Sequence, residues 1–234
     1  MNDSSMTPPV QTMAWSHIVA SGSQAEVFLQ GQLTQDMAQV DERGVWSLVL
    51  APDSVVIGTC LVRRADAAMV MVVERELAED ARRRLARFLL RTDCQLTVSE
   101  VSSGPFVDAA ERVVRGWPGA AEFAAGLTPH SFGESFVRST ISFTKGCFTG
   151  QELVGRLDAR GSSVPWRLVR ASGPDRDQVN AVLRSKGPTG PQGLTTVVEV
   201  SGGVTGLGFA HRTLLDSGSE AIAFSDGVVV VPIG

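Results

Sequence analysis

Residues 145–152, KGCFTGQE, hold more candidate chemistry than any other stretch of this 234-residue chain. Two glycines allow tight backbone turns that bring main-chain N–H groups close to a ligand. A cation, a thiol, an amide and a carboxylate stand around them. The neighbouring lysine and free loop amides favour a thiolate, which predicts a reactive thiol at Cys147. The alternative is a turn with a buried, inert cysteine, because free cysteines often pack as small core residues.

The composition is that of a globular chain with a substantial core. Hydrophobic residues make up 43% of the sequence. At roughly 100 to 200 residues per domain, the length allows one large domain or a few small ones without metal or disulfide staples. The 21 basic and 25 acidic residues give a net charge of −4. This balance argues against a surface that follows nucleic-acid phosphates, so we expect no nucleic-acid partner.

The cysteines and the N-terminus predict the cellular compartment. Cys60, Cys94 and Cys147 are odd in number and widely spaced, which indicates neither a disulfide framework nor a zinc site. Free thiols are typical of a reducing compartment. Residues 1–12 lack Lys, Arg and the apolar stretch of a signal peptide, and are expected to be a disordered tail. Because no apolar run approaches the ~18 residues of a membrane span, we expect a soluble, cytoplasmic protein without a membrane partner.

Two further groups of basic side chains are open to interpretation. Four arginines follow one another closely: Arg82, Arg83, Arg84 and Arg87. They form either an anion site or a solvated helix face, and the preceding glutamates favour the solvated face. The histidines stand apart from one another: His17, His130 and His211. Without acidic or cysteine partners at ligand spacing, they are expected to be structural or solvent-facing, and no metal site is predicted.

Apolar periodicity predicts a mixed α and β body over residues 13–160. Strands are expected at 14–20, 45–50, 55–62, 69–73 and 96–101, the second and third joined by a turn at 51–54. A capping-box spacing at 23–26 predicts the start of a short helix. Apolar residues at helical spacing predict a longer helix over 74–90. The stretch 109–161 mixes helical and irregular segments.

Beyond Pro165 the pattern changes to strands and turns, which predicts a small C-terminal β domain over residues 165–234. Strands are expected at 195–200, 204–210, 221–224 and 228–233, with a short helix at 177–184. The Gly- and Pro-rich stretch 186–193 is expected to be a surface loop.

The stretch 145–152 resembles the signature of the YgfZ-like branch of the glycine-cleavage T-protein superfamily. These folate-binding proteins are implicated in iron–sulfur cluster assembly and repair. Other elements follow in the family's order, so that the resemblance spans residues from about 15 to 210. They are FLQGQLTQD at 28–36, the Arg112-x-x-x-Gly116-x-Pro118 segment, Thr128-Pro129-His130, LVGR at 153–156 and Val204-Thr205-Gly206.

The resemblance implies an α+β, T-protein-like ring of two α+β subdomains with a small C-terminal β-barrel-like domain. A central hole would hold tetrahydrofolate or a related pterin. The implied folate-binding residues are Gln32, Asp36, Arg112, Lys145, Gln151 and Glu152, and the implied reactive residues are Cys147 and Asp36. Carboxylates and amides suit a pterin, while Arg and Lys suit the glutamate tail. Asp36 is either a general base or a helix or turn cap.

Three functions follow from this resemblance. The first is a tetrahydrofolate-binding accessory protein that uses Cys147 in the assembly or repair of iron–sulfur client proteins. The second is a folate-dependent aminomethyl or one-carbon transferase with Asp36 as base. The third is a scaffold of the same fold that has lost its ligand.

The sequence also departs from the family pattern. Phe148 stands where tyrosine is frequent, so the ring can pack while the hydroxyl is absent. Ser131 replaces a common glutamate, and residues 53–56 lack the glycine of the family's hairpin turn. Trp117 and Phe132 either line a pterin slot or belong to the core.

Overall fold

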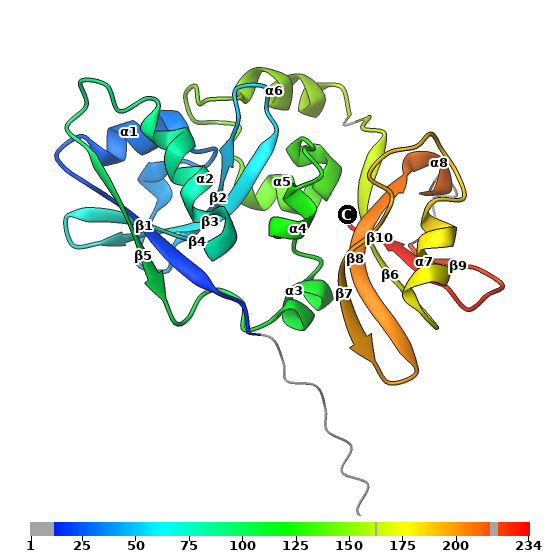
Figure 1. Ribbon diagram of the computed structural model, residues 1–234. Coiled ribbons are helices and arrows are strands. Elements are labelled where there is room, and N and C mark those ends of the chain that lie inside the picture. Colours follow the sequence, from blue (N-terminus) through cyan, green and yellow to red (C-terminus); the bar gives the residue numbers. More distant parts are fainter. Residues whose placement is uncertain (1–11, 162, 216–219) are drawn as a thin grey trace, which may run out of the picture.

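Two five-stranded antiparallel sheets, joined by a layer of short helices, make up the fold (Figure 1). The computed structural model describes residues 12–161, 163–215 and 220–234. Residues 1–11 of the expected tail lie outside this range. Thr12 pairs with Asp108 in an isolated β-bridge.

The first sheet has the strand order β2-β3-β4-β1-β5. Its strands are β1 (Trp15–Ser21), β2 (Val45–Leu50), β3 (Val56–Ala65), β4 (Ala68–Glu74) and β5 (Gln95–Val101). Helices α1 (Ala25–Gln32) and α2 (Arg75–Ala86) share a buried core with these strands. Ile18 of β1, Met71 of β4 and Leu85 of α2 are fully buried in that core. The apolar sides of these strands and helices therefore meet in one core.

The second sheet has the order β7-β8-β6-β10-β9. Its strands are β6 (Trp166–Gly173), β7 (Gly193–Val200), β8 (Gly203–His211), β9 (Ile222–Ala223) and β10 (Val229–Pro232). Helices α7 (Arg176–Leu183) and α8 (Arg212–Leu215) pack on it. The sheet does not close on itself within the described residues, so the expected barrel-like closure is not confirmed. The division of the chain at 160–165 stays a prediction.

A layer of short helices lies between the sheets (Figure 1). It comprises α3 (Ala109–Arg115), α4 (Ala120–Phe123), η2 (Pro129–Phe132) and α5 (Glu134–Thr140). Helix α6 (Gln151–Ala159) follows α5 in the chain, and η1 (Met37–Gln39) lies between α1 and β2. Phe132 and Phe136 pack with Leu48 of β2 on one side and with Phe209 of β8 on the other. This common core makes Phe132 a packing residue, as one of its two interpretations predicts.

The structure corrects two local predictions in the first half. Helix α1 begins at Ala25 without a side-chain cap, so the capping box expected at 23–26 is wrong. The hydroxyl of Ser23 instead donates to the Asp93 carboxylate at 2.6 Å, a partner 70 residues away in the chain. Helix α2 ends at Ala86 and not at 90, because turns follow it and Arg91 adopts a positive φ of 61°.

Strand β6 has no counterpart among the predicted strands. Arg167 and Arg170 interrupt its apolar run, so the sequence shows no recognisable strand pattern there. In the structure β6 lies at the centre of the second sheet, between β8 and β10. Leu168 and Val169 are fully buried there, so both faces of the strand carry core residues.

Candidate functional site

The signature loop, residues 145–150, is held against the C-terminal end of α1. The Lys145 ammonium donates hydrogen bonds to the carbonyl oxygens of Gln30, Leu33 and Gln35 at 2.5, 2.9 and 2.9 Å. These contacts use all three donors of the ammonium group. Burial lowers the pKa of Lys145 to about 8, while the nearby Asp36 carboxylate acts in the opposite direction. Lys145 therefore serves as a cap for the end of α1.

Gln32 connects the same helix end to two other segments. Its side-chain oxygen Oε1 accepts a hydrogen bond from Nη1 of Arg84 at 2.7 Å. The same oxygen accepts a hydrogen bond from the hydroxyl of Thr149 at 3.2 Å. The signature loop and α2 are thus joined through one amide of the FLQGQLTQD element.

Asp36 is placed as a cap. Its Oδ1 accepts hydrogen bonds from the backbone N–H of Ala38 at 3.1 Å and from the Gln30 amide at 3.0 Å. It occupies the N-cap position of η1. These contacts match the capping interpretation of Asp36, and both are made by Oδ1.

The turn between Cys147 and Gln151 separates exposed from buried side chains. Cys147 is an exposed free thiol, whereas Phe148 is buried with its ring centroid 5.5 Å from the Lys145 ammonium. Gly150 has a φ of +82°, and a Cβ there would lie 2.8 Å from the Ala51 carbonyl oxygen. Gln151 then opens α6. The tight turn therefore leaves the thiol at the surface, in contrast to the interpretation of a buried cysteine.

Glu152 and Arg112 lie in different surroundings. Glu152 is exposed and pairs with Arg156 one turn along α6, at 2.6 Å. Arg112 is buried and forms an ion pair with Glu122 of α4, while its Nη2 donates to the hydroxyl of Thr196 on β7 at 2.8 Å. The structure thus brings Gln32, Asp36 and Lys145 to the C-terminal end of α1. Cys147 follows Lys145 in the loop, and Gln151 begins α6. Arg112 instead joins the helical layer to the second sheet.

A cavity of about 450 Å³ opens beside α2 and α4 and is here called the α2–α4 cavity. Ile57, Leu77 and Phe123 are among its apolar walls. The arginines that line it are Arg83, Arg84 and Arg87, with Asp80 as the acidic neighbour. The cavity therefore combines apolar surface with a cationic side.

Arg84 is buried, so the solvated helix face expected for the four arginines is wrong for this one. It is only 4% exposed, and its Nε donates to the Leu50 carbonyl oxygen at 2.6 Å. Its Nη2 has no hydrogen-bond partner within the described residues. Burial, together with the charge of Arg87, lowers the pKa of Arg84 to about 10. The available signal was its spacing, because residue 84 lies three positions after the buried Ala81 and so faces the core side of α2.

Four aromatic side chains form a separate cluster beside the first sheet: Trp15, Trp46, Phe106 and Trp117. The rings of Trp46 and Trp117 are 4.6 Å apart. The indole N–H of Trp117 has no partner in the part of the chain that the structure describes. Both interpretations of Trp117, core residue and stacking wall, remain compatible with this position.

Neither a metal centre nor a membrane span emerges from the described residues. They contain no group of three or more His, Cys, Asp and Glu side chains placed to bind a metal ion. No helix among them has the length and apolar character needed to cross a bilayer.

The fold is similar to that of an enzyme of the glycine cleavage system. No protein-family model and no curated protein matches the sequence. Among solved structures, the glycine cleavage system aminomethyltransferase T from Bartonella henselae matches with a TM-score of 0.55 and 13% sequence identity. The match covers 96% of this chain and 86% of that chain. The similarity supports the T-protein-like fold that the sequence predicts.

Proposed function

We propose that the chain binds a reduced folate in the α2–α4 cavity. The observation that carries the proposal is the buried Arg84 guanidinium, whose Nη2 has no partner among the described residues. A buried donor without a partner is costly, and a carboxylate would satisfy it with a charge-assisted hydrogen bond. Tetrahydrofolate carries such carboxylates on its glutamate tail.

The remainder of the cavity suits the other end of a folate. Its volume of about 450 Å³ falls within the roughly 300 to 1,000 Å³ of small-molecule sites. Ile57, Leu77 and Phe123 offer apolar surface to an aromatic ring system. Gln32 orients Arg84 through its 2.7 Å hydrogen bond, which gives the FLQGQLTQD element an indirect part in folate binding.

The accessory role in iron–sulfur assembly or repair is part of the same proposal. Its support is the exposed Cys147 thiol at the end of a loop fixed by Lys145. Fe–S client proteins would be the partners of that surface, and a reducing, cytoplasmic location would keep the thiol free. Gln151, which opens α6 next to the loop, would contact the same partner or the folate.

A folate-dependent aminomethyl transferase is the second candidate, because the structural neighbour is described as an aminomethyltransferase. This candidate requires Asp36 to act as base. The capping hydrogen bonds of Asp36 favour the accessory role instead.

Titration calorimetry with tetrahydrofolate tests the folate proposal. Ala124 lines the cavity, whereas its neighbour Ala121 does not, and both are exposed. We expect saturable binding to the wild type, a loss of more than about tenfold in Ala124→Trp, and unchanged affinity in Ala121→Trp. Arg87→Gln should weaken binding by about tenfold, because one charge-assisted contact is removed. Absence of binding to the wild type would instead support the ligand-free scaffold.

Complementation tests the role of Cys147. In a strain that lacks the gene, Cys147→Ser should fail to restore the activity of iron–sulfur enzymes, whereas Cys94→Ser should restore it. Cys94 is the matched control, because it is a buried thiol whose pKa burial raises. Restoration by Cys147→Ser would exclude the thiol role and leave folate binding untouched.

A further inference from the structure

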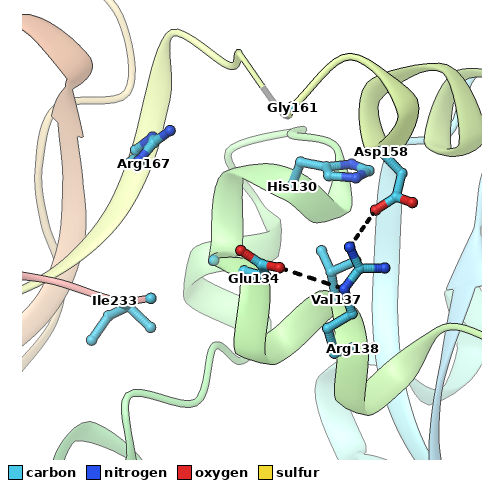
Figure 2. Close-up of a pocket in the computed structure, with 10 residues that line it drawn as sticks. His130, Glu134, Val137, Arg138, Asp158, Gly161, Arg167 and Ile233 are labelled. Atoms are coloured by element: carbon cyan, nitrogen blue, oxygen red, sulfur yellow. Dashed lines mark ion pairs between the residues drawn. The ribbon is translucent and has the colours of Figure 1, made fainter.

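A second cavity, away from the α2–α4 cavity, surrounds His130 and is here called the His130 cavity (Figure 2). Its volume is about 310 Å³. Its side chains come from η2, α5, α6 and β6, and residues 233–234 close one side. Those with polar groups are His130, Glu134, Arg138, Asp158 and Arg167.

His130 is the unexplained residue in this cavity. It is 6% exposed, yet neither Nδ1 nor Nε2 has a hydrogen-bond partner within the described residues. Burial lowers the pKa of the imidazole, with Arg138 acting in the same direction and Asp158 against it. A neutral imidazole presents one donor and one acceptor. The buried ring therefore has one donor and one acceptor that no described residue satisfies.

The two acidic side chains of the cavity share one cation. Arg138 pairs with Asp158 at 2.8 Å and approaches Glu134 at 3.6 Å (Figure 2). A neutral hydroxyl suits this region, because it can donate to a carboxylate or to the imidazole and also accept from the ring N–H.

The opposite side of the cavity is cationic. Arg167 is exposed and has no acidic partner within the described residues. It also lines an adjoining cavity of about 220 Å³, together with Arg212 and Ser163. Arg212 donates a hydrogen bond to the Ser163 hydroxyl at 2.6 Å, and none of the described residues that line this adjoining cavity carries a carboxylate. Paired guanidinium groups are well suited to phosphate oxygens.

We infer that the His130 cavity binds a small hydroxylated phosphate monoester. Its phosphate lies between Arg167 and Arg212, and its hydroxyl groups bond to His130. This site is separate from the proposed folate site, since the two cavities share no lining residue.

Thermal-shift and calorimetric titrations at constant ionic strength test the inference with two probes. Inorganic phosphate tests the contacts of Arg167 and Arg212 with the phosphate group alone. Glycerol 3-phosphate tests these contacts together with those of the hydroxyl groups to His130. We expect both to bind the wild type, glycerol 3-phosphate at least about fivefold more tightly. The double variant Arg167→Gln/Arg212→Gln should lose both, whereas Arg43→Gln, an exposed arginine elsewhere, should lose neither.

The contribution of His130 is measured separately. His130→Phe should bind phosphate like the wild type but lose the preference for glycerol 3-phosphate, and His130→Asn serves if the Phe variant does not fold. Ring nitrogen resonances of His130 should shift with glycerol 3-phosphate in the wild type. The inference is overturned if neither probe binds saturably or if the Arg167/Arg212 variant binds both normally. Equal affinity of the wild type for the two probes would also overturn it. Folate binding should be unchanged in the variants of Arg167, Arg212 and His130, because none of these residues lines the α2–α4 cavity. Failure of one proposal can therefore be distinguished from failure of the other.

Discussion

Lys145 illustrates how contacts between distant residues decide the role of a side chain. Its cation lies where the carbonyl oxygens at the end of α1 point, and a positive charge at a helix C-terminus is favourable. The three acceptors come from residues more than 100 positions earlier in the chain. The KGCFTGQE pattern could identify this lysine as important, but it could not distinguish capping from ligand binding.

Acidification should destabilise the protein through His130. Because burial lowers its pKa in the folded state, the unfolded state binds more protons as the pH falls through the ordinary value near 6.5. The free energy of unfolding should therefore fall by up to about 1.4 kcal/mol per pH unit below that value and be insensitive to this group above it. Urea unfolding between pH 8 and pH 5 measures the effect. His130→Asn should have a shallower profile, and parallel profiles would contradict the assignment.

At the scale of elements, the strands and helices that pack on one face were predictable from periodicity. The hairpin of β2 and β3 and the helix α2 fall close to their predicted ranges. The failures have local causes. Ser23 donates to the distant Asp93 carboxylate and does not cap α1. The two arginines of β6 interrupt the apolar pattern by which a strand is recognised. Both depend on side chains that meet only after folding.

The signature turn provides an element-scale prediction. Gly150 has a positive φ and lies close to the Ala51 carbonyl, whereas a Cβ at Gly146 would meet nothing within 4 Å. Gly150→Ala should therefore lower the free energy of unfolding by about 1 to 3 kcal/mol. Gly146→Ala, the matched control four residues earlier, should change it by less than about 0.5 kcal/mol. Equal effects of the two substitutions in chemical denaturation would show that the turn is not constrained.

At the scale of the whole molecule, one buried ion pair joins the helical layer to the second sheet. Glu122 accepts hydrogen bonds from Arg112, from the Gly119 backbone and from the hydroxyls of Thr195 and Thr196 on β7. The family resemblance implies a ligand role for Arg112, and spacing alone does not reveal its partner Glu122. The pair instead lies in the connection between the two sheets.

Removal of the Glu122 charge should weaken that connection. Glu122→Gln removes the carboxylate that pairs directly with the buried Arg112 guanidinium, at a cost of about 3 kcal/mol in unfolding free energy. Glu111→Gln, which breaks a surface pair with Arg115, should cost less than about 1 kcal/mol. Urea unfolding followed by tryptophan fluorescence measures both. A small effect at Glu122 would mean that the shared aromatic core alone holds the sheets together.

The position of β1 has a consequence for how the chain folds. It lies between β4 and β5, and Trp15 pairs with Glu74 on one side and with Val101 on the other. The first strand of the sheet thus cannot complete its pairing until residues up to 101 are present. Such distant pairings require a large loop to close, which costs conformational entropy before the strand contacts form. The first sheet should therefore assemble slowly, with β1 entering after the β2-β3-β4 meander has formed.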